Sequence, residues 1–291
     1  MNHLAASELI LNPDGSIYHL NLKPEHLADT ILLVGDQNRV DKITQYFDKV
    51  DVVIKKREFH TQTGVYKGKR ISVISTGIGT DNIDIVLNEL DALVNIDFET
   101  RQIKENKTSL NIIRIGTSGS IQKDIPVDSI VISELAVGFD SLLHYYQSDD
   151  VQLQDFNEAI EDHLNTYERN SKPYVVPADS NLVKTFMSEE VFSGFTGSNV
   201  GFYAPQGRVL RLPLRDDNMK DKLAAFSFKG KKITNLEMET SAIFGLSKML
   251  GHKALSLNAI IANRATGNFT KDGAKAVDNT IKYTLEKLLS V

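Results

Sequence analysis

Arg114 is the residue whose surroundings say most about chemistry, because it lies inside an apolar run that is followed at once by Gly-Thr-Ser-Gly. Residues 112–115 predict a buried strand, and a buried guanidinium needs an anionic partner. The glycines of the motif would let backbone N–H groups approach a ligand, and Thr117 and the serine offer hydroxyl donors. The segment indicates an anion site, with phosphate as the best fit. The alternative is a structural pair between the arginine and a glutamate under a tight turn.

A second anion-binding pattern follows the apolar run at residues 30–34. Gly35 makes a turn there, and Arg39 falls in the first turn of the helix that we expect next. Backbone amides at a helix N-terminus together with an arginine favour an anion. The alternative is a turn glycine, a cap made by Asp36 and a solvated arginine. The spacing G-x-G-x-x-G is absent here and at residues 77–79, so we expect no dinucleotide cofactor.

Residues 201–208, GFYAPQGR, combine an aromatic ring, a neutral amide and a fixed cation in one short loop. Gln206 can both donate and accept hydrogen bonds, and Arg208 can donate to a carbonyl, which suits a planar polar heterocycle such as uracil. Phe202 is available to stack against a ring. The alternative is a loop with an aromatic anchor and an exposed arginine.

Glu237 and Glu239 stand two residues apart at an expected junction between a strand and an apolar helix. Both carboxylates could point into a site, where they would accept hydrogen bonds from the two vicinal hydroxyls of a sugar. The alternative is acidic charge that complements the helix dipole, which needs only one of them. Arg57 and His19 show nothing unusual by themselves, and each fits a solvated or structural side chain.

The elements that must position these side chains alternate along the chain. Apolar runs followed by helical patterns predict a largely parallel or mixed sheet with helices on both faces. Ligands of such sheets bind at the carboxyl ends of the strands, where the glycine-rich segments lie. No linker or repeat divides the chain, so we expect a single domain over residues 1–291. We expect strands at residues 30–34, 52–54, 71–74, 112–115, 129–132 and near 197–203, 232–236 and 254–262, and helices at 38–47, 83–94, 240–250 and 274–289, with a polar, irregular region at 140–180.

The composition excludes several classes of protein. The chain has 291 residues, 41% of them apolar, and a net charge of −5 from 33 basic and 38 acidic side chains, which argues against a nucleic-acid binder. It has no cysteine and no histidines at metal-ligand spacing, so we expect no metal site. No run approaches the ~18 apolar residues of a membrane span. The N-terminus lacks a secretory pattern, so we expect a cytoplasmic protein without a membrane partner.

Taken together, the order and spacing of these segments resemble the nucleoside phosphorylase family, and within it the bacterial uridine phosphorylases, over most of the chain. The resemblance implies an α/β fold with a single-domain mixed β-sheet, distorted toward a barrel and flanked by helices. It also implies that phosphate is bound by Gly35 and Arg39 of GDQNR and by Arg114 and Thr117 of RIGT. Arg57, from the Arg-Glu-Phe segment, is implied to enter the phosphate site of a neighbouring subunit.

The same resemblance implies the rest of the site. The Glu-Met-Glu segment would bind ribose, with Glu239 on the 2′- and 3′-hydroxyls, and His19 of HLNL would reach the ribose 5′-hydroxyl in a neighbouring subunit. Ribose contacts are therefore expected from His19, Glu237, Met238 and Glu239, and base contacts from Phe202, Gln206 and Arg208.

The implied reaction is the phosphorolysis of uridine or a related pyrimidine nucleoside. Arg114, Glu239 and Arg208 are its expected catalytic residues, nucleoside and inorganic phosphate are its substrates, and no cofactor is needed. Sites shared between subunits imply a homo-oligomer, either a dimer or a hexamer built from dimers. The alternatives on the same scaffold are a purine nucleoside phosphorylase and a nucleosidase, and a non-catalytic nucleoside-binding protein is the alternative outside enzymes.

Two departures bear on these expectations. Purine-specific relatives place an aspartate on the base where this chain has Asn263, which favours a pyrimidine; by themselves Asn263 and Arg264 read as a solvated pair at a strand end. Residues 80–82, Thr-Asp-Asn, replace a Gly-Pro-Ser-like stretch of the family, which leaves open whether a monovalent cation binds near Glu58.

Overall fold

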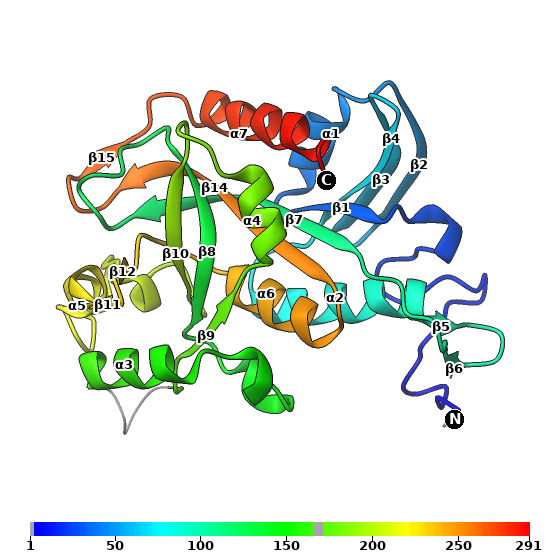
Figure 1. Cartoon of the computed structure of the whole chain (residues 1–291), viewed down its shortest axis with the longest axis horizontal. Coiled ribbons are helices and arrows are strands. Elements are labelled where there is room, and N and C mark those ends of the chain that lie inside the picture. Colours follow the sequence, from blue (N-terminus) through cyan, green and yellow to red (C-terminus); the bar gives the residue numbers. More distant parts are fainter. Residues whose placement is uncertain (1–2, 166–170) are drawn as a thin grey trace.

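The computed structural model describes residues 3–165 and 171–291. Its main feature is an 11-stranded mixed sheet in the order β15-β14-β8-β10-β13-β7-β1-β4-β3-β2, with β9 paired to β8 outside this path (Figure 1). Its strands are β1 (Thr30–Val34), β2 (Lys49–Lys56), β3 (Phe59–Tyr66), β4 (Lys69–Ser75), β7 (Asn111–Ser120), β8 (Ile130–Gly138), β9 (Tyr174–Pro177), β10 (Phe192–Ser198), β13 (Asn235–Glu237), β14 (Lys253–Asn263) and β15 (Asn268–Phe269). Two small sheets pair β5 (Ile96–Asp97) with β6 (Gln102–Ile103) and β11 (Ser227–Phe228) with β12 (Lys231–Lys232).

Helices cover both faces of the main sheet. They are α1 (Gln37–Thr44), α2 (Thr80–Asn95), α3 (Gln154–Leu164), α4 (Ser180–Phe186), α5 (Met219–Ala225), α6 (Thr240–Met249) and α7 (Gly273–Leu288), with short 3-10 helices η1 (Pro24–His26), η2 (Leu142–Tyr145), η3 (Asp149–Val151) and η4 (Ala204–Gln206). β1 shows how the layers form: Ile31 and Leu33 pack into the cluster that holds α2 and α6, whereas Leu32 and Val34 pack into the cluster that holds α1, α4 and α7. Successive residues of a strand point to opposite faces, so a continuous apolar strand needs helices on both sides.

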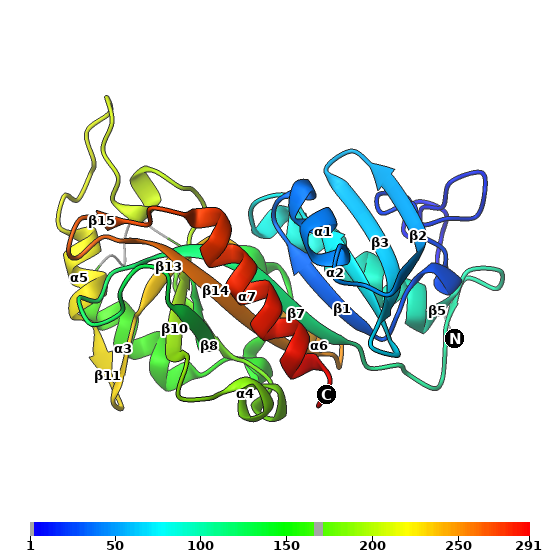
Figure 2. The same ribbon diagram turned by 90° about the horizontal axis from the view of Figure 1, so that it is seen from above.

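Five of the strands close into a barrel. β7 pairs parallel with β14, β14 antiparallel with β8, β8 parallel with β10, β10 parallel with β13, and β13 antiparallel with β7. β7 also pairs parallel with β1, so it belongs both to the barrel and to the open part of the sheet. Figure 2 shows β7 and β14 running between the layer that contains β1, β2 and β3 on one side and the other barrel strands on the other. The predicted α/β class, with a distorted barrel-like mixed sheet flanked by helices, is confirmed.

Several element boundaries differ from those expected from the sequence. β7 does not end at residue 115 but continues to Ser120, so the Gly-Thr-Ser-Gly motif is strand and not a tight turn. The strand expected near 197–203 is β10, which ends at Ser198. The polar region at 140–180 contains α3 and β9. For β7 and β9, pairing with strands distant in the sequence outweighs the local pattern.

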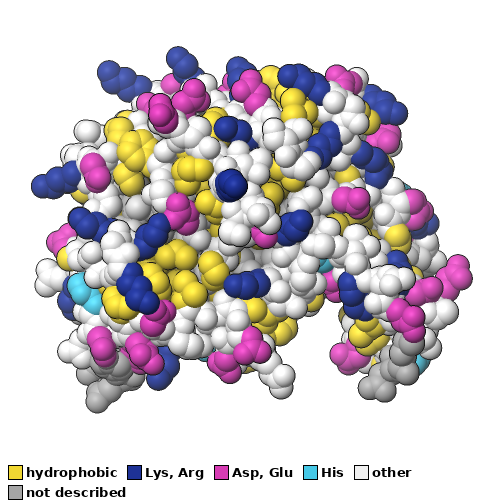
Figure 3. Space-filling model, viewed as in Figure 1, with side chains coloured by type: hydrophobic (Ala, Val, Ile, Leu, Met, Phe, Trp, Pro, Cys, Tyr) yellow, Lys and Arg dark blue, Asp and Glu magenta, His cyan; other side chains and the backbone are white. Residues whose placement is uncertain are grey.

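The surface matches the charge balance of the chain. On the face drawn in Figure 3, acidic and basic side chains are interspersed, and no broad area of that face carries one sign. Within the described ranges, no helix is both long enough and apolar enough to cross a membrane.

Candidate active site

A cleft of about 970 Å³ opens at the ends of β1, β4 and β13, and residues of β7 form part of its lining. One wall, which we call the strand side, consists of these strands and the turns that follow them. The opposite wall, the loop side, consists of the segment after β10 and the end of β14. Most of the residues expected to bind a ligand line it: Gly35, Arg39, Arg114, Thr117, Phe202, Gln206, Arg208, Glu237, Met238 and Glu239.

Arg114 lies at the centre of the strand side and is only 6% exposed. Its Nη2 donates to Oε2 of Glu239 and lies 3.4 Å from Oε2 of Glu237, while its Nη1 makes no hydrogen bond with any described residue. Burial alone would lower the pKa of Arg114, but the two carboxylates outweigh burial and raise it. The pairing with a glutamate that the sequence left as an alternative therefore exists, and it lies inside the cleft.

Gly116 makes room for this arginine. A β-carbon at position 116 would overlap Nη1 of Arg114 and lie 2.9 Å from Oδ1 of Asn258. The glycine was expected to bring backbone amides close to a ligand. In the structure it lies inside β7, and its missing side chain is the space that the guanidinium fills.

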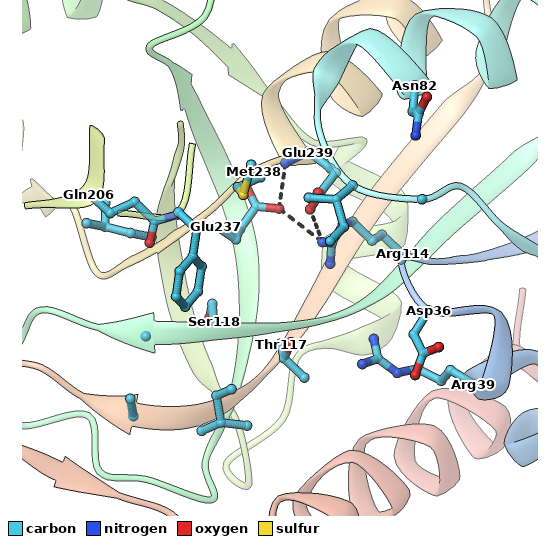
Figure 4. A pocket seen from close by; sticks show the side chains of 18 of the residues that line it. Asp36, Arg39, Asn82, Arg114, Thr117, Ser118, Gln206, Glu237, Met238 and Glu239 are labelled. Carbon is cyan, nitrogen blue, oxygen red and sulfur yellow. Dashed lines mark hydrogen bonds and ion pairs between the residues drawn. The ribbon is translucent and has the colours of Figure 1, made fainter. Parts of the chain in front are cut away.

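Arg39 supplies a second cation to the strand side. Asp36 caps α1 by accepting from the backbone N–H of Asn38 (2.9 Å), as expected, but Arg39 is not the solvated side chain of that alternative. Its Nη1 donates to the carbonyl of Ile115 (3.1 Å), and burial together with the positive charge of Arg114 lowers the pKa of Arg39 to about 10. Figure 4 shows Arg39 and Thr117 on the side of Arg114 that faces away from Glu239. Two cations that disfavour each other beside one cavity favour an anion between them.

The two glutamates do different things. Glu237 accepts from Ser198 Oγ (2.6 Å) and from the backbone N–H groups of Glu239 (3.0 Å) and Thr240 (3.0 Å), so its carboxylate closes the N-terminus of α6. Burial raises the pKa of Glu237, and Arg114 opposes that effect only in part. Glu239 accepts from the backbone N–H of Gly79 (2.8 Å) and from Arg114. Glu237 therefore has the helix-end role that the sequence offered as an alternative. Glu239 is the carboxylate that contacts both Arg114 and the turn at Gly79.

The loop side holds a compact pair of polar groups. Arg208 Nη1 donates to Gln206 Oε1 (2.6 Å) and to the carbonyl of Phe202 (2.7 Å), and its guanidinium lies 3.9 Å from the centre of the Phe202 ring. Gln206 is buried, whereas Phe202 is half exposed. Burial and the nearby charge of Arg264 lower the pKa of Arg208 to about 10. The amide and the guanidinium therefore face the cleft as one unit.

Arg264 is a cleft residue, although by sequence it looked like half of a solvated pair at a strand end. It lines the loop side and donates to the carbonyls of Gln206 and Gly207, so it ties the loop to the end of β14. Asn263 is not solvated either. It is buried, it donates to the carbonyls of Gln122 (2.9 Å) and Ile125 (2.8 Å), and it is not among the residues that line the cleft. The sequence showed only an adjacent Asn-Arg pair at a strand end. The role of Arg264 becomes apparent only once the fold places the loop at residues 206–207 beside it.

Arg57 and His19 lie outside the cleft of their own chain, although they lie close to each other. His19 Nδ1 bonds to Glu89 Oε1 (2.7 Å), and the Arg57 guanidinium lies 5.9 Å from the ring centre of Tyr18. Arg57 has a φ of +53° in the turn between β2 and β3, and the next residue, Glu58, lines the cleft. The cross-subunit roles of Arg57 and His19 remain predictions.

The fold and the cleft match a known family. The model of the phosphorylase superfamily matches residues 29–290, which is most of the chain, so the protein belongs to this superfamily.

Individual relatives carry more specific names. A uridine phosphorylase of Thermococcus kodakarensis is 30% identical over 269 residues, covering 90% of this chain and 83% of that protein. A DeoD-type purine nucleoside phosphorylase of Bacillus subtilis is 29% identical over 253 residues, covering 87% of this chain and 89% of that protein. A Trypanosoma brucei nucleoside phosphorylase, described as showing uridine phosphorylase activity, superposes with a TM-score of 0.87 at 32% identity, covering 98% of this chain and all of that one.

Proposed function

We propose that this protein cleaves the N-glycosidic bond of uridine, or of a related pyrimidine nucleoside, with inorganic phosphate, giving the free base and ribose 1-phosphate. The observation that carries the proposal is a pair of arginines, the buried Arg114 and the half-buried Arg39, lining the same cleft as Glu239 and the Gln206–Arg208 unit. The two relatives with uridine phosphorylase names or activity, each at least 30% identical, support the same reaction.

Phosphate is the nucleophile in this proposal. Arg39, Arg114 and Thr117 would hold it, together with the turn at Gly35. As the C1′–N1 bond lengthens, the ribose gains positive charge, and the bound phosphate stabilises that charge before its oxygen forms the new bond to C1′. Because phosphate, ribose and base are held in fixed relative positions, positioning contributes much of the rate.

The ribose and the base would contact the remaining walls of the cleft. Glu239 would accept from the 2′- and 3′-hydroxyls beside Met238, with Glu237 acting through the end of α6. Gln206 and Arg208 would stabilise the negative charge that the base acquires as it leaves, and Phe202 would pack against its ring. The contact between Arg208 and Gln206 supports this assignment, because it orients the amide for a base with adjacent donor and acceptor groups.

A purine nucleoside phosphorylase is the second candidate, and the DeoD-type relatives are its support. The position of Asn263 favours the pyrimidine instead. Its amide donates to two backbone carbonyls and accepts from the backbone N–H groups of Ala265 (3.0 Å) and Thr266 (3.0 Å), which leaves it turned away from a base. A nucleosidase has no need for two phosphate-directed arginines.

The assembly and its surroundings complete the proposal. We infer a homo-oligomer, a dimer or a hexamer of dimers, in which Arg57 and His19 act in a neighbour's site, because both lie outside their own cleft on one surface. No cofactor is required by the chemistry, and no group of three or more metal-ligating side chains occurs among the residues that the structure describes. We further infer a cytoplasmic location.

A nucleoside panel assayed with and without phosphate tests the function. Uridine should release uracil only when phosphate is present, and inosine and adenosine should react much more slowly. Phosphate-independent release of base would identify a nucleosidase, faster cleavage of inosine would identify a purine phosphorylase, and binding without release would identify a non-catalytic protein.

A further inference from the structure

Two buried polar atoms beside Gly116 make no hydrogen bond with any residue that the structure describes. One is Arg114 Nη1, a donor, and the other is Asn258 Oδ1, an acceptor. A buried donor or acceptor without a partner is destabilising, so a donor and an acceptor left unpaired beside the same glycine need an explanation.

The register of the barrel brings the two side chains together. Asn258 on β14 lies directly opposite Gly116 on β7, and Arg114 is two residues earlier on β7, so its side chain leaves the same face of the strand. A β-carbon at position 116 would overlap Arg114 Nη1 and lie 2.9 Å from Asn258 Oδ1. Because Gly116 has no side chain, the guanidinium and the amide oxygen can both occupy the space beside it.

Two serine hydroxyls of the barrel interior orient the Asn258 amide. Its Nδ2 lies 3.3 Å from Ser256 Oγ and 3.5 Å from Ser133 Oγ, both fully buried hydroxyls of the barrel interior. With the nitrogen directed at the serines, the oxygen is directed at Gly116. Ser256 also bonds to Thr240 Oγ1 (3.0 Å) at the start of α6, so this interior contact runs from Asn258 to the helix that Glu237 caps.

From this arrangement we propose that Asn258 is a positioning residue for Arg114, an inference that rests on the proposed function. When phosphate binds, Asn258 Oδ1 accepts one N–H of Arg114 Nη1 and leaves the second for the phosphate. The guanidinium is then held from two directions, by Glu239 at Nη2 and by the amide at Nη1.

The neutrality of the amide is part of the proposal. Arg114 already faces two carboxylates, and with Arg39 the four charged groups sum to zero when all are ionised. A third carboxylate at position 258 would occupy the same volume as the amide, but it would compete with phosphate for the guanidinium. An asparagine supplies the acceptor without cancelling the charge that phosphate needs.

The variant Asn258→Asp tests this directly. We expect its KM for phosphate to rise by about tenfold or more while its KM for uridine changes by less than about twofold. Titration calorimetry with inorganic phosphate alone should show the same loss of affinity, independently of turnover. Asn95→Asp is the matched control, because Asn95 is a buried amide on α2 that donates to Asp91 (2.6 Å) and does not line the cleft. It should lose stability with phosphate affinity unchanged.

A second variant keeps the test decisive if Asn258→Asp does not fold. Asn258→Ser removes the amide oxygen without adding charge, and we expect a smaller rise in the phosphate KM, about threefold, with a fall in kcat. Phosphate affinity equal to that of the parent in the folded variant, by both KM and calorimetry, overturns the role of Asn258.

The parent protein separates this inference from the proposed function. A parent that binds phosphate but releases no base refutes the proposed reaction, while the calorimetric comparison of Asn258→Asp with the parent still decides the role of Asn258. A parent that binds no phosphate refutes both.

Discussion

The strand side and the loop side of the cleft hold their arginines in opposite ways. Arg114 lies inside a strand paired on both edges, is almost fully buried, and meets its carboxylate partners across the sheet. Arg208 lies in a loop, is half buried, and is held by a side-chain amide two residues away and a backbone carbonyl six residues away. The first arrangement depends on the whole fold, whereas the second depends on one short segment and its tie to Arg264.

This difference indicates that the reaction and the choice of base depend on different parts of the cleft. Groups proposed to act on phosphate and ribose are fixed by strand register and buried charge, so changing them disturbs the protein as well as the chemistry. Groups proposed to recognise the base are fixed by local contacts on a loop, which can change while the scaffold stays intact. Relatives named for pyrimidine and for purine nucleosides on one family scaffold fit that division.

Replacement of Arg114 should give the largest effect. Arg114→Met leaves Glu237 and Glu239 buried without their cation, which should lower the free energy of unfolding by about 3–5 kcal/mol. Loss of a preorganised cation at the reacting centre should also reduce kcat/KM by about a hundredfold or more. Urea denaturation and uridine turnover measure the two losses. Arg70→Met is the control, since Arg70 bonds to the carbonyls of Leu27 and Glu25 away from the cleft; a loss of activity there equal to that of Arg114→Met would break the comparison.

Stabilisation of the folded protein by bound phosphate should be the second largest effect. Burial and, after it, the charge of Arg114 lower the pKa of Arg39, so an anion that binds both arginines relieves their repulsion and stabilises the folded state. At about 100 times its Kd, phosphate should add about 2.7 kcal/mol, seen as a rise in Tm. Arg39→Met should remove most of this protection, and Arg208→Ala should keep it. Equal protection by chloride at matched ionic strength would argue against a specific site.

Replacement of Arg208 should affect activity without affecting the scaffold. Arg208→Ala should lower kcat/KM for uridine by more than about tenfold, or about 1.4 kcal/mol, because the leaving base loses its cation. Its unfolding free energy should change by less than about 1 kcal/mol, since the side chain is half exposed. Arg211→Ala, on the same loop and outside the cleft lining, should leave both quantities unchanged. Unchanged uridine cleavage in Arg208→Ala would refute the base-side assignment.

Release of the loop from β14 should have the smallest effect. Arg264→Ala removes the donors to the carbonyls of Gln206 and Gly207, so the loop should open more often. Hydrogen exchange of residues 201–210 should speed up, and kcat/KM should fall by about fivefold, or about 1 kcal/mol. Exchange rates that stay at the parent level would show that Arg264 does not hold the loop.

Much of the strand side was predictable from the sequence. An arginine in an apolar strand requires an anion or a carboxylate nearby, and the structure provides the carboxylates of Glu237 and Glu239. The local sequence is misleading where pairing with distant strands decides the structure. The motif after Arg114 looks like a turn because it contains two glycines, but pairing of β7 with β14 and β13 continues the strand through it.

On the loop side, local contacts were predictable from the sequence, but contacts with distant residues were not. Phe202, Gln206 and Arg208 could be grouped because they are neighbours in the chain, and they do lie together. Arg264 could not, because nothing local indicates that the end of β14 meets a loop nearly sixty residues earlier. Likewise Asn263 looks solvated until the fold brings two backbone carbonyls to its amide.

The closed barrel also sets the order in which the protein can fold. Arg114 is synthesised early in β7, and Glu239, its partner, follows 125 residues later. The barrel closes only when β14 inserts between β7 and β8. At about 5–20 residues per second, translation of that interval takes about 6–25 s, during which β7 carries a charge without its native partner. Arg114, at the centre of the cleft, therefore meets its carboxylate partners only late in synthesis.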